Sequence, residues 1–198
     1  MEIIKCDRSS TVYTEIGRYL EYLENNDAIP LKQSRISEGE ALRRGLNDVF
    51  FNIPIVLIFI VRDEQYCYGG IRCSMSKESG NIDHLSSCNG TGKELIKKVL
   101  LYAKSENKKK ITLDAAGDAV VDLTKTEEEQ RRNRNESQLK LVHYYSKLNF
   151  TLTSGQYDLN QLQSKEFIEE LIESQQYIRS GLMSLNLDSV TEDDINQL

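Results

Sequence analysis

The stretch Gly90-Thr91-Gly92-Lys93-Glu94-Leu95-Ile96 is the most informative part of the chain, because it joins a short predicted strand, residues 81–87, to an amphipathic helix. Two glycines let the backbone turn tightly and approach a ligand closely. The N–H groups at the start of the following helix would then point at an anion. We predict an anion-binding turn here, and an ordinary tight turn is the alternative.

The helix after this turn is predicted from the spacing of its apolar residues. These recur at helical intervals and are Leu95, Ile96, Val99, Leu100 and Ala103. A nucleotide-binding P-loop is excluded, because Ser87 stands where that motif needs its first glycine and Glu94 where it needs a hydroxyl residue for magnesium. ATP hydrolysis is therefore not expected.

The order of elements around the turn resembles the GCN5-related N-acetyltransferase superfamily. The acetyl-CoA loop of that family follows the pattern Q/R-x-x-G-x-G/A, and Gly90 and Gly92 match its two glycines. A later helix of the family commonly ends in Tyr-x-Lys-Leu-Gly-Phe, which resembles Tyr145-Ser-Lys-Leu-Asn-Phe150. Asn149 replaces the glycine, and asparagine also tolerates the left-handed conformation that ends a helix. The resemblance covers about residues 50–155.

The chain also departs from the family pattern at particular positions. Ser87 replaces the usual Gln or Arg, and Gln138 and Leu141 stand where Asn and Ala are common. Most of the expected contact with the pyrophosphate comes from backbone amides, which a change of side chain leaves in place.

The resemblance implies an α/β fold with a central, mostly antiparallel, twisted mixed sheet flanked by helices. The chain of 198 residues is long enough for such a domain. We expect an acetyltransferase domain over residues 1–156 and an acidic, helical C-terminal extension over residues 157–198. The expected strands are residues 2–6, 54–61, 66–75, 81–87 and 110–116, and two N-terminal helices are expected after Ser9 or Ser10 and after Ser37.

Acetyl-CoA is the co-substrate that the resemblance implies, with its diphosphate on the amides of residues 89–93. Backbone N–H groups near Leu85 to Ser87 would polarise the thioester carbonyl. The residues expected to contact the cofactor are Leu85, Ser87, Cys88, Asn89, Gly90, Thr91, Gly92, Lys93, Gln138 and Lys147.

Two residues are expected to carry the catalysis. Tyr145 matches the family tyrosine that protonates the departing thiolate, and an ordinary core tyrosine is the alternative. Asn81 stands where some relatives have a glutamate base, so we assign that role to Asp83, two residues further along the strand and on the same face. By the same alternation His84 should point to the opposite face, and His143, next to the tyrosine pair, is a packed or surface residue in the plainer interpretation.

Residues 117–137 are polar, and they predict either a mobile loop or a short helix with Glu127-Glu128-Glu129 opposite Arg131-Arg132. The net charge is −6, and residues 157–198 carry nine acids and two bases. Nucleic acid is therefore not expected as a partner. The acidic segment could attract amines, cover a hydrophobic edge or mediate homodimerisation.

Cysteine and hydropathy patterns bear on the cellular setting. The four cysteines are scattered without a CxxC motif, so neither structural zinc nor disulfides are expected, and a reduced cytoplasm or nucleus is favoured. The longest apolar run, residues 53–61, is far shorter than a membrane span, and no signal peptide is visible.

The leading functional hypothesis is therefore acetyl transfer from acetyl-CoA to an amine. The acceptor would be a small molecule, a polyamine, or a protein lysine or N-terminus. The alternatives are a catalytically degenerate fold of the same type that binds CoA or a protein, and a nucleic-acid or protein adaptor that uses the arginines of residues 131–134.

Overall fold

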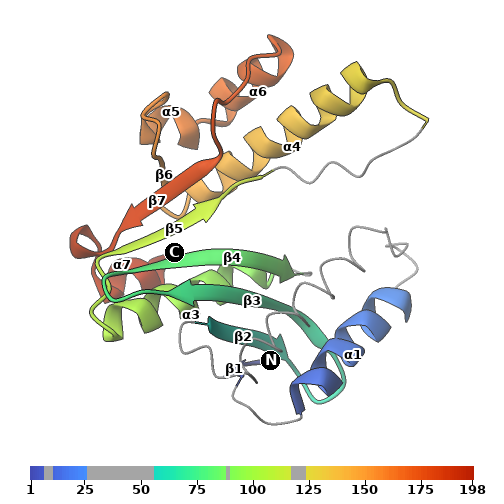
Figure 1. Cartoon of the computed structure of the whole chain (residues 1–198), viewed down its shortest axis with the longest axis vertical. Coiled ribbons are helices and arrows are strands. Elements are labelled where there is room, and N and C mark those ends of the chain that lie inside the picture. The colour runs from blue at the N-terminus through green and yellow to red at the C-terminus, as the bar shows by residue number, and fades with distance from the viewer. Residues whose placement is uncertain (7–10, 26–55, 88–89, 117–123) are drawn as a thin grey trace. The chain divides into compact units, whose positions relative to one another are not determined.

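The computed structural model describes residues 1–6, 11–25, 56–87, 90–116 and 124–198. The chain divides into two compact units, residues 1–111 with 187–198, and residues 112–186. Its strands form one sheet in the order β1-β2-β3-β4-β5-β7-β6, and Figure 1 labels the helices beside it. The pairs β1–β2, β2–β3, β3–β4 and β6–β7 are antiparallel, in agreement with the expected mostly antiparallel sheet, although β6 and β7 themselves were not expected. Strand β5, Lys110–Asp114, runs from the first unit into the second.

In its described residues, the first unit is an antiparallel meander with α1 on one face and α3 on the other. Its strands are β1 (Glu2–Lys5), β2 (Val56–Arg62), β3 (Cys67–Met75) and β4 (Ser79–Ser87), and its long helices are α1 (Thr11–Asn25) and α3 (Gly92–Ser105). The ring of Phe59 on β2 contacts Tyr102 of α3. Ile60, the next residue, pairs with Gly70, and Gly70 pairs with Ser86, which α1 contacts through Tyr19. Because successive residues of a strand face opposite sides, α1 and α3 cover opposite faces.

Helix α3 forms as its apolar spacing predicts. Its predicted apolar residues, Leu95, Ile96, Val99, Leu100 and Ala103, are all fully buried. The end of the chain packs against this helix through the 3-10 turn η1 (Leu187–Ser189) and α7 (Glu192–Gln197). Lys104 donates to the carbonyls of Leu187 and Val190, and Lys97 donates to that of Asn196 at 3.1 Å. The last acidic segment is thus joined to the basic side of α3.

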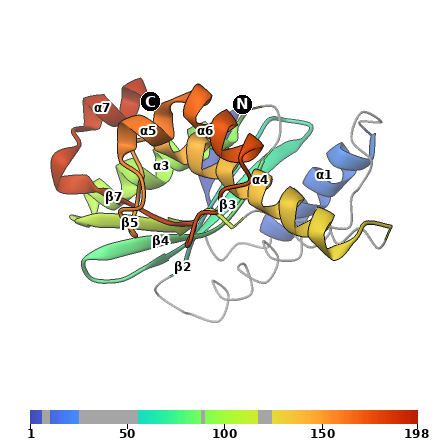
Figure 2. The same ribbon diagram turned by 90° about the horizontal axis from the view of Figure 1, so that it is seen from above.

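The second unit is built around α4 (Glu127–Ser146), with α5 (Leu159–Gln163) and α6 (Lys165–Glu173) packed on it (Figure 2). Strands β6 (Thr151–Leu152) and β7 (Leu182–Asn186) complete it. The Ser146 hydroxyl and His143 Nδ1 both meet the carbonyl oxygen of Leu162, at 2.9 and 2.8 Å, which joins α4 to α5. His143 is therefore a packing residue in this unit.

The structure decides between two alternatives and corrects one expectation in the second half of the chain. Of the loop and the helix predicted for the polar segment, the helix is confirmed for residues 127–137, which form the first half of the longer helix α4. Thr126 and Glu129 form a capping box at its start. Residues 157–198 are not only helical, since they also contribute β7, which lies between β5 and β6 in the sheet. The expected helix after Ser37, the start of the strand at Pro54 and residues 117–123 lie outside the described residues. The domain boundary after residue 156 stays a prediction.

Candidate functional site

The turn before α3 has the backbone geometry that anion binding requires. Gly90 adopts φ +74°, in the left-handed region where a side chain is strained. Thr91 is the N-cap of α3 but makes no side-chain hydrogen bond to the first turn, and its hydroxyl donates to the carbonyl of Tyr68 at 3.3 Å. The first N–H groups of a helix have no partner within the helix. Those of α3 also lack a side-chain cap, which is the arrangement that anion sites at helix N-termini use.

Strands β3 and β4 approach each other closely just before this turn. A side chain at Gly69, which has φ +149°, would place its Cβ 2.3 Å from the carbonyl oxygen of Ser86. The backbones of the two strands therefore come too close at Gly69 for any residue with a side chain. Ser86 is also tied to α1, because its hydroxyl and that of Tyr19 lie 2.6 Å apart in a buried hydrogen bond.

A β-bulge in β4 places Asp83 outside the regular pairing. Arg72 pairs with His84 and Cys73 with Ile82, so Asp83 is the extra residue between them. Ser74 pairs with Asn81, and Arg72 and Ser74 are two residues apart on one face of β3. His84 consequently lies on the face of Asn81. The expectation that His84 points to the opposite face is wrong, because strict alternation fails at a bulge.

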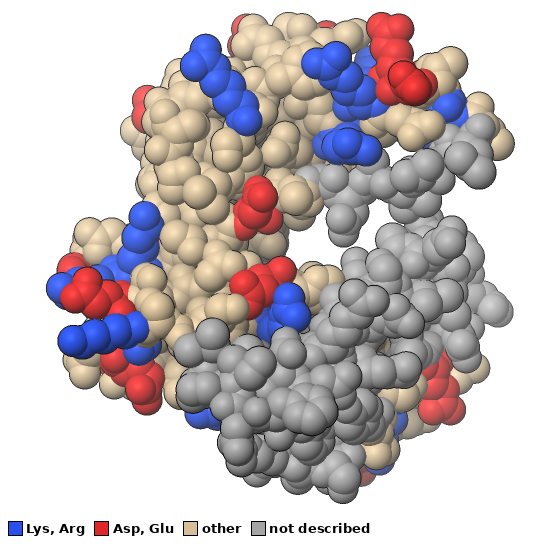
Figure 3. Space-filling view, viewed as in Figure 1, with Lys and Arg blue, Asp and Glu red and all other residues tan. Residues whose placement is uncertain are grey.

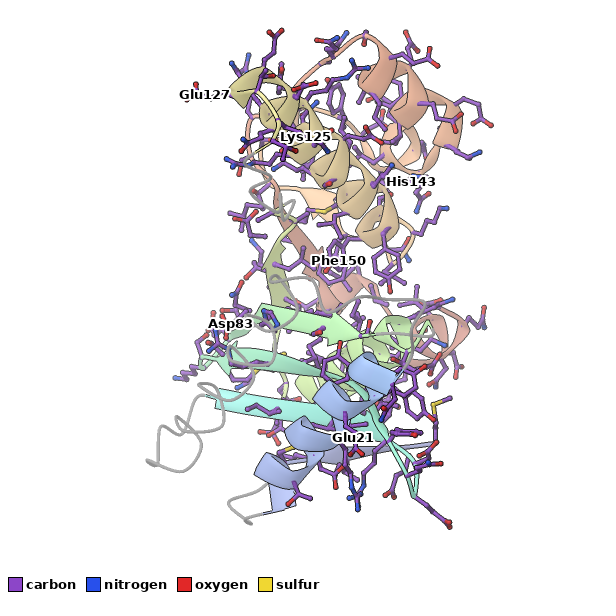
Figure 4. The ribbon with its side chains drawn as sticks, turned by 90° about the vertical axis from the view of Figure 1, so that its right-hand side faces the viewer. Glu21, Asp83, Lys125, Glu127, His143 and Phe150 are labelled. Atoms are coloured by element: carbon purple, nitrogen blue, oxygen red, sulfur yellow. The ribbon has the colours of Figure 1, made fainter. Side chains whose placement is uncertain are left out.

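Asp83 projects from β4 and is exposed (Figure 4). The Asn81 side-chain amide donates to one carboxylate oxygen at 2.7 Å, and the Ser74 hydroxyl donates to the other. Its carboxylate thus lies on the same face as the side chains of Asn81 and Ser74. Both oxygens keep further acceptor capacity, since an ionised carboxylate has about four lone-pair sites.

Tyr145 lies near the end of α4, in the second unit. It is 8% exposed, and its ring packs edge-on against Tyr144 and Phe150, with centroids 5.2 and 6.1 Å apart. Burial, and to a smaller extent Tyr144, raises the pKa of Tyr145 to about 12. Its hydroxyl has no hydrogen-bond partner within the part of the chain that the structure describes. Asn149 then ends the helix with φ +65°, which confirms the predicted left-handed residue at this position.

No family model and no curated protein matches the sequence. Among solved structures, an aminoglycoside 6'-acetyltransferase type Ii aligns over 94% of this chain and 97% of its own, with TM-score 0.51 and 13% identity. Tetrahymena GCN5 aligns over 97% and 99%, with TM-score 0.50 and 12% identity. The chain has the fold of the GCN5-related N-acetyltransferases. At these identities the likeness concerns the fold.

The other positions expected to contact a cofactor in this acetyltransferase fold are divided between the two units. Leu85 and Ser87 are half-buried on β4, Thr91 and Gly92 are buried, and Lys93 is exposed in the first turn of α3. In the second unit, Gln138 lies on α4 and the exposed Lys147 is the C-cap of that helix (Figure 4 labels His143 and Phe150 nearby). Cys88 and Asn89 lie outside the described residues. The cofactor roles of all these residues stay predictions.

Metal ligands, membrane-spanning helices and surface charge also bear on the function. Among the described residues, no group of three or more His, Cys, Asp or Glu is arranged to hold a metal ion, and no helix is both long and apolar enough to cross a membrane. The arginines of residues 131–134 lie on α4 beside Glu127–Glu129, and charges of both signs are interspersed on the face of the molecule in Figure 3. Arg131 stacks over the ring of Tyr177 at 4.8 Å.

Sequence reasoning missed Tyr19, Arg72 and Ser74 as parts of the site. The sequence indicated only that Tyr19 is a core residue of its helix, because its partner Ser86 is 67 residues away. Ser74 and Arg72 become neighbours of Asp83 and His84 through the register of β3 and β4. A charged residue in the middle of an otherwise apolar strand was the one available signal for Arg72.

Proposed function

We propose that this chain transfers an acetyl group from acetyl-CoA to a primary amine by direct attack in a ternary complex. The observation that carries the proposal is the start of α3, where a left-handed Gly90 is followed by a helix whose first turn has no side-chain cap. Such a turn suits the diphosphate of the cofactor, because N–H groups and the helix dipole both favour an anion there. The GCN5-related fold supports this assignment as an analogy.

In the proposed reaction, the amine nitrogen attacks the thioester carbonyl carbon and the carbon–sulfur bond breaks. The products are an amide and the free thiol of CoA. Backbone N–H groups of residues 85–87 polarise the carbonyl oxygen, and the proton lost by the attacking nitrogen passes to Asp83, directly or through a water molecule. Asp83 suits this role because it is exposed and its carboxylate is already oriented by Ser74 and Asn81.

Tyr145 acts on the leaving sulfur. With a pKa of about 12 its phenol stays protonated at every physiological pH. A thiol has a pKa of about 8.5, so the departing thiolate is a weaker base than the phenolate of Tyr145. The phenol therefore stabilises the sulfur mainly by donating a hydrogen bond while negative charge develops. The thiolate of CoA then takes a proton from water to become the free thiol. Its hydroxyl, which has no partner among the described residues, is available for this bond.

The test combines cofactor binding with thiol release. Calorimetric titration with acetyl-CoA should give saturable binding, and incubation with a panel of polyamines, aminoglycosides, amino acids and lysine-containing peptides should release free CoA. Binding without thiol release from any amine would instead support the catalytically degenerate module. Absence of CoA binding would overturn both assignments.

A further inference from the structure

Arg72 is a charged side chain in the middle of the sheet without a hydrogen-bond or ionic partner in the described residues. It lies on β3 between Ile58, which is fully buried, and His84. The residue is half-buried, and its Nε atom is buried without a hydrogen-bond acceptor. A guanidinium presents five N–H donors and cannot lose its charge at neutral pH. Burying one of these donors without an acceptor is costly, so the arrangement indicates a ligand that supplies the acceptor.

The surroundings of Arg72 carry the opposite charge on the same face of the sheet. Arg72 and Ser74 share that face, and Ser74 donates to the carboxylate of Asp83. The charges of Asp83 and Arg72 both act on the buried thiol of Cys73. Burial raises the pKa of this thiol, the negative charge of Asp83 raises it further, and the positive charge of Arg72 lowers it. Arg72 and Asp83 are thus near each other, yet they make no ion pair in the described part of the structure. Each charge remains available to a ligand.

We propose that Arg72 binds a carboxylate of the acceptor, so that the substrates are amines that also carry a carboxylate, as amino acids do. The guanidinium accommodates a carboxylate through two parallel N–H···O bonds, and Asp83 faces the amino group of the same molecule. This inference rests on the proposed acetyl transfer, because it names the substrate class of that reaction. A positive and a negative group on one face complement a zwitterion better than a polyamine, which Arg72 would repel.

The experiment compares amino acids with their C-terminal amides, which keep the amine and lose the carboxylate charge. Thiol release is measured for the wild type, Arg72→Gln, Arg72→Met and, as a matched control, Arg132→Gln, which removes an exposed arginine of α4. For the wild type we expect kcat/KM to be roughly 10- to 100-fold higher for an amino acid than for its amide, the size of a lost charged hydrogen bond. Arg72→Gln should remove that preference, and Arg132→Gln should keep it.

Two further measurements separate recognition from other roles of Arg72. If Arg72 serves only packing, replacing it lowers the melting temperature. If its unpaired charge is instead kept for a ligand, the Arg72→Met protein melts at the same or a higher temperature than the wild type. If Arg72 holds a phosphate of the cofactor, the Arg72 variants lose affinity for CoA in calorimetry; we expect their CoA affinity to be unchanged. Either contrary result, or an unchanged preference for the carboxylate in Arg72→Gln, would overturn the assignment.

The design also distinguishes failure of this inference from failure of the proposed reaction. If no amine releases thiol from the wild type, acetyl transfer fails, and carboxylate recognition is then measured by ligand-observed NMR of amino acids and their amides with the CoA-saturated protein. Carboxylate-selective binding that Arg72→Gln abolishes would support Arg72 without the reaction. Equal binding to the wild type and to Arg72→Gln would refute it.

Discussion

The hydroxyls of Tyr19 and Ser86 lie 2.6 Å apart, although 67 residues separate them in the chain. Tyr19 belongs to α1 and is 1% exposed, and Ser86 belongs to β4 and is 3% exposed. This bond fixes α1 against the end of the strand that leads into the turn of Gly90. Removing one of two buried hydroxyls that share a hydrogen bond is costly, because the other hydroxyl loses this bond and is shielded from water.

The first prediction concerns this pair. Tyr19→Phe should lower the free energy of unfolding by about 1 to 2 kcal/mol, the cost of a buried hydrogen-bonding group that loses its partner. Urea denaturation monitored by circular dichroism measures the change. Tyr66→Phe is the matched control, because the ring of Tyr66 contacts Tyr22 and no hydrogen bond of its hydroxyl is found in the described residues.

The double variant Tyr19→Phe/Ser86→Ala shows whether the two hydroxyls act as a pair. Its loss of stability should be smaller than the sum of the two single losses, since neither hydroxyl then remains buried without the other. Strict additivity would show that the two hydroxyls are energetically independent.

The second prediction concerns the turn before α3. Acetyl-CoA at a hundredfold excess over its Kd should stabilise the wild type by about 2.7 kcal/mol, because the ligand binds the folded state. Gly92→Val should remove most of that shift in a thermal melt, since a branched side chain crowds the first N–H groups of the helix. Gly17→Val is a suitable control, because a Cβ at Gly17 meets no atom within 4 Å. An unchanged shift in a folded Gly92→Val protein would argue against this turn as the cofactor site.

The third prediction separates chemistry from packing at Tyr145. Tyr145→Phe keeps the ring that contacts Phe150 and removes only the hydroxyl. We expect kcat to fall roughly 10- to 1000-fold while CoA affinity and melting temperature change little, because the lost bond forms mainly in the transition state. Full kcat under conditions where chemistry limits turnover would exclude a catalytic role. A large drop in stability would instead indicate a structural hydrogen bond.

The fourth prediction follows from the raised pKa of the same residue. The pKa of Tyr145 is about 12 in the folded protein and 10.0 for an unperturbed tyrosine. The folded state therefore binds the proton more tightly, so this stabilisation is complete below pH 10 and is lost as the pH rises through 12. The loss is on the order of 2 to 3 kcal/mol. Chemical denaturation at pH 9 and pH 11.5 should show a smaller alkaline loss for Tyr145→Phe than for the wild type.

The fifth prediction concerns the hairpin turn between β2 and β3. Backbone N–H groups of Tyr66 and Gln65 and the Tyr68 hydroxyl donate to Asp63, which lowers its pKa from 3.8 to about 2. A lowered folded-state pKa contributes stability that is present above pH 3.8 and lost as the pH falls through 2. Asp63→Asn should therefore lower the urea midpoint at pH 7 and have little effect at pH 2. An equal effect at both pH values would show that the charge is not involved.

Local sequence patterns were sufficient for the elements whose residues supply their own signals. The apolar spacing of residues 95–103 predicted α3, and the two glycines at residues 90 and 92 predicted the tight turn before it. Asn149 predicted a left-handed backbone position, because few other residues tolerate that conformation. The strands β2, β3 and β4 lie close to the ranges that the sequence predicted for them, residues 54–61, 66–75 and 81–87. Each of these signals lies within about a dozen residues.

The candidate site depended on relations between strands that no local pattern contains. The bulge at Asp83 appears only when β4 is paired with β3, and it moves His84 onto the face of Asn81 and Arg72. In the same way, β7 enters the sheet between β5 and β6 from the far end of the chain. The sequence by itself determined α1, α3 and the strands β1 to β5, since propensity and periodicity act over short distances. Tertiary structure decided which side chains share a face, because strand register is set by packing between distant segments.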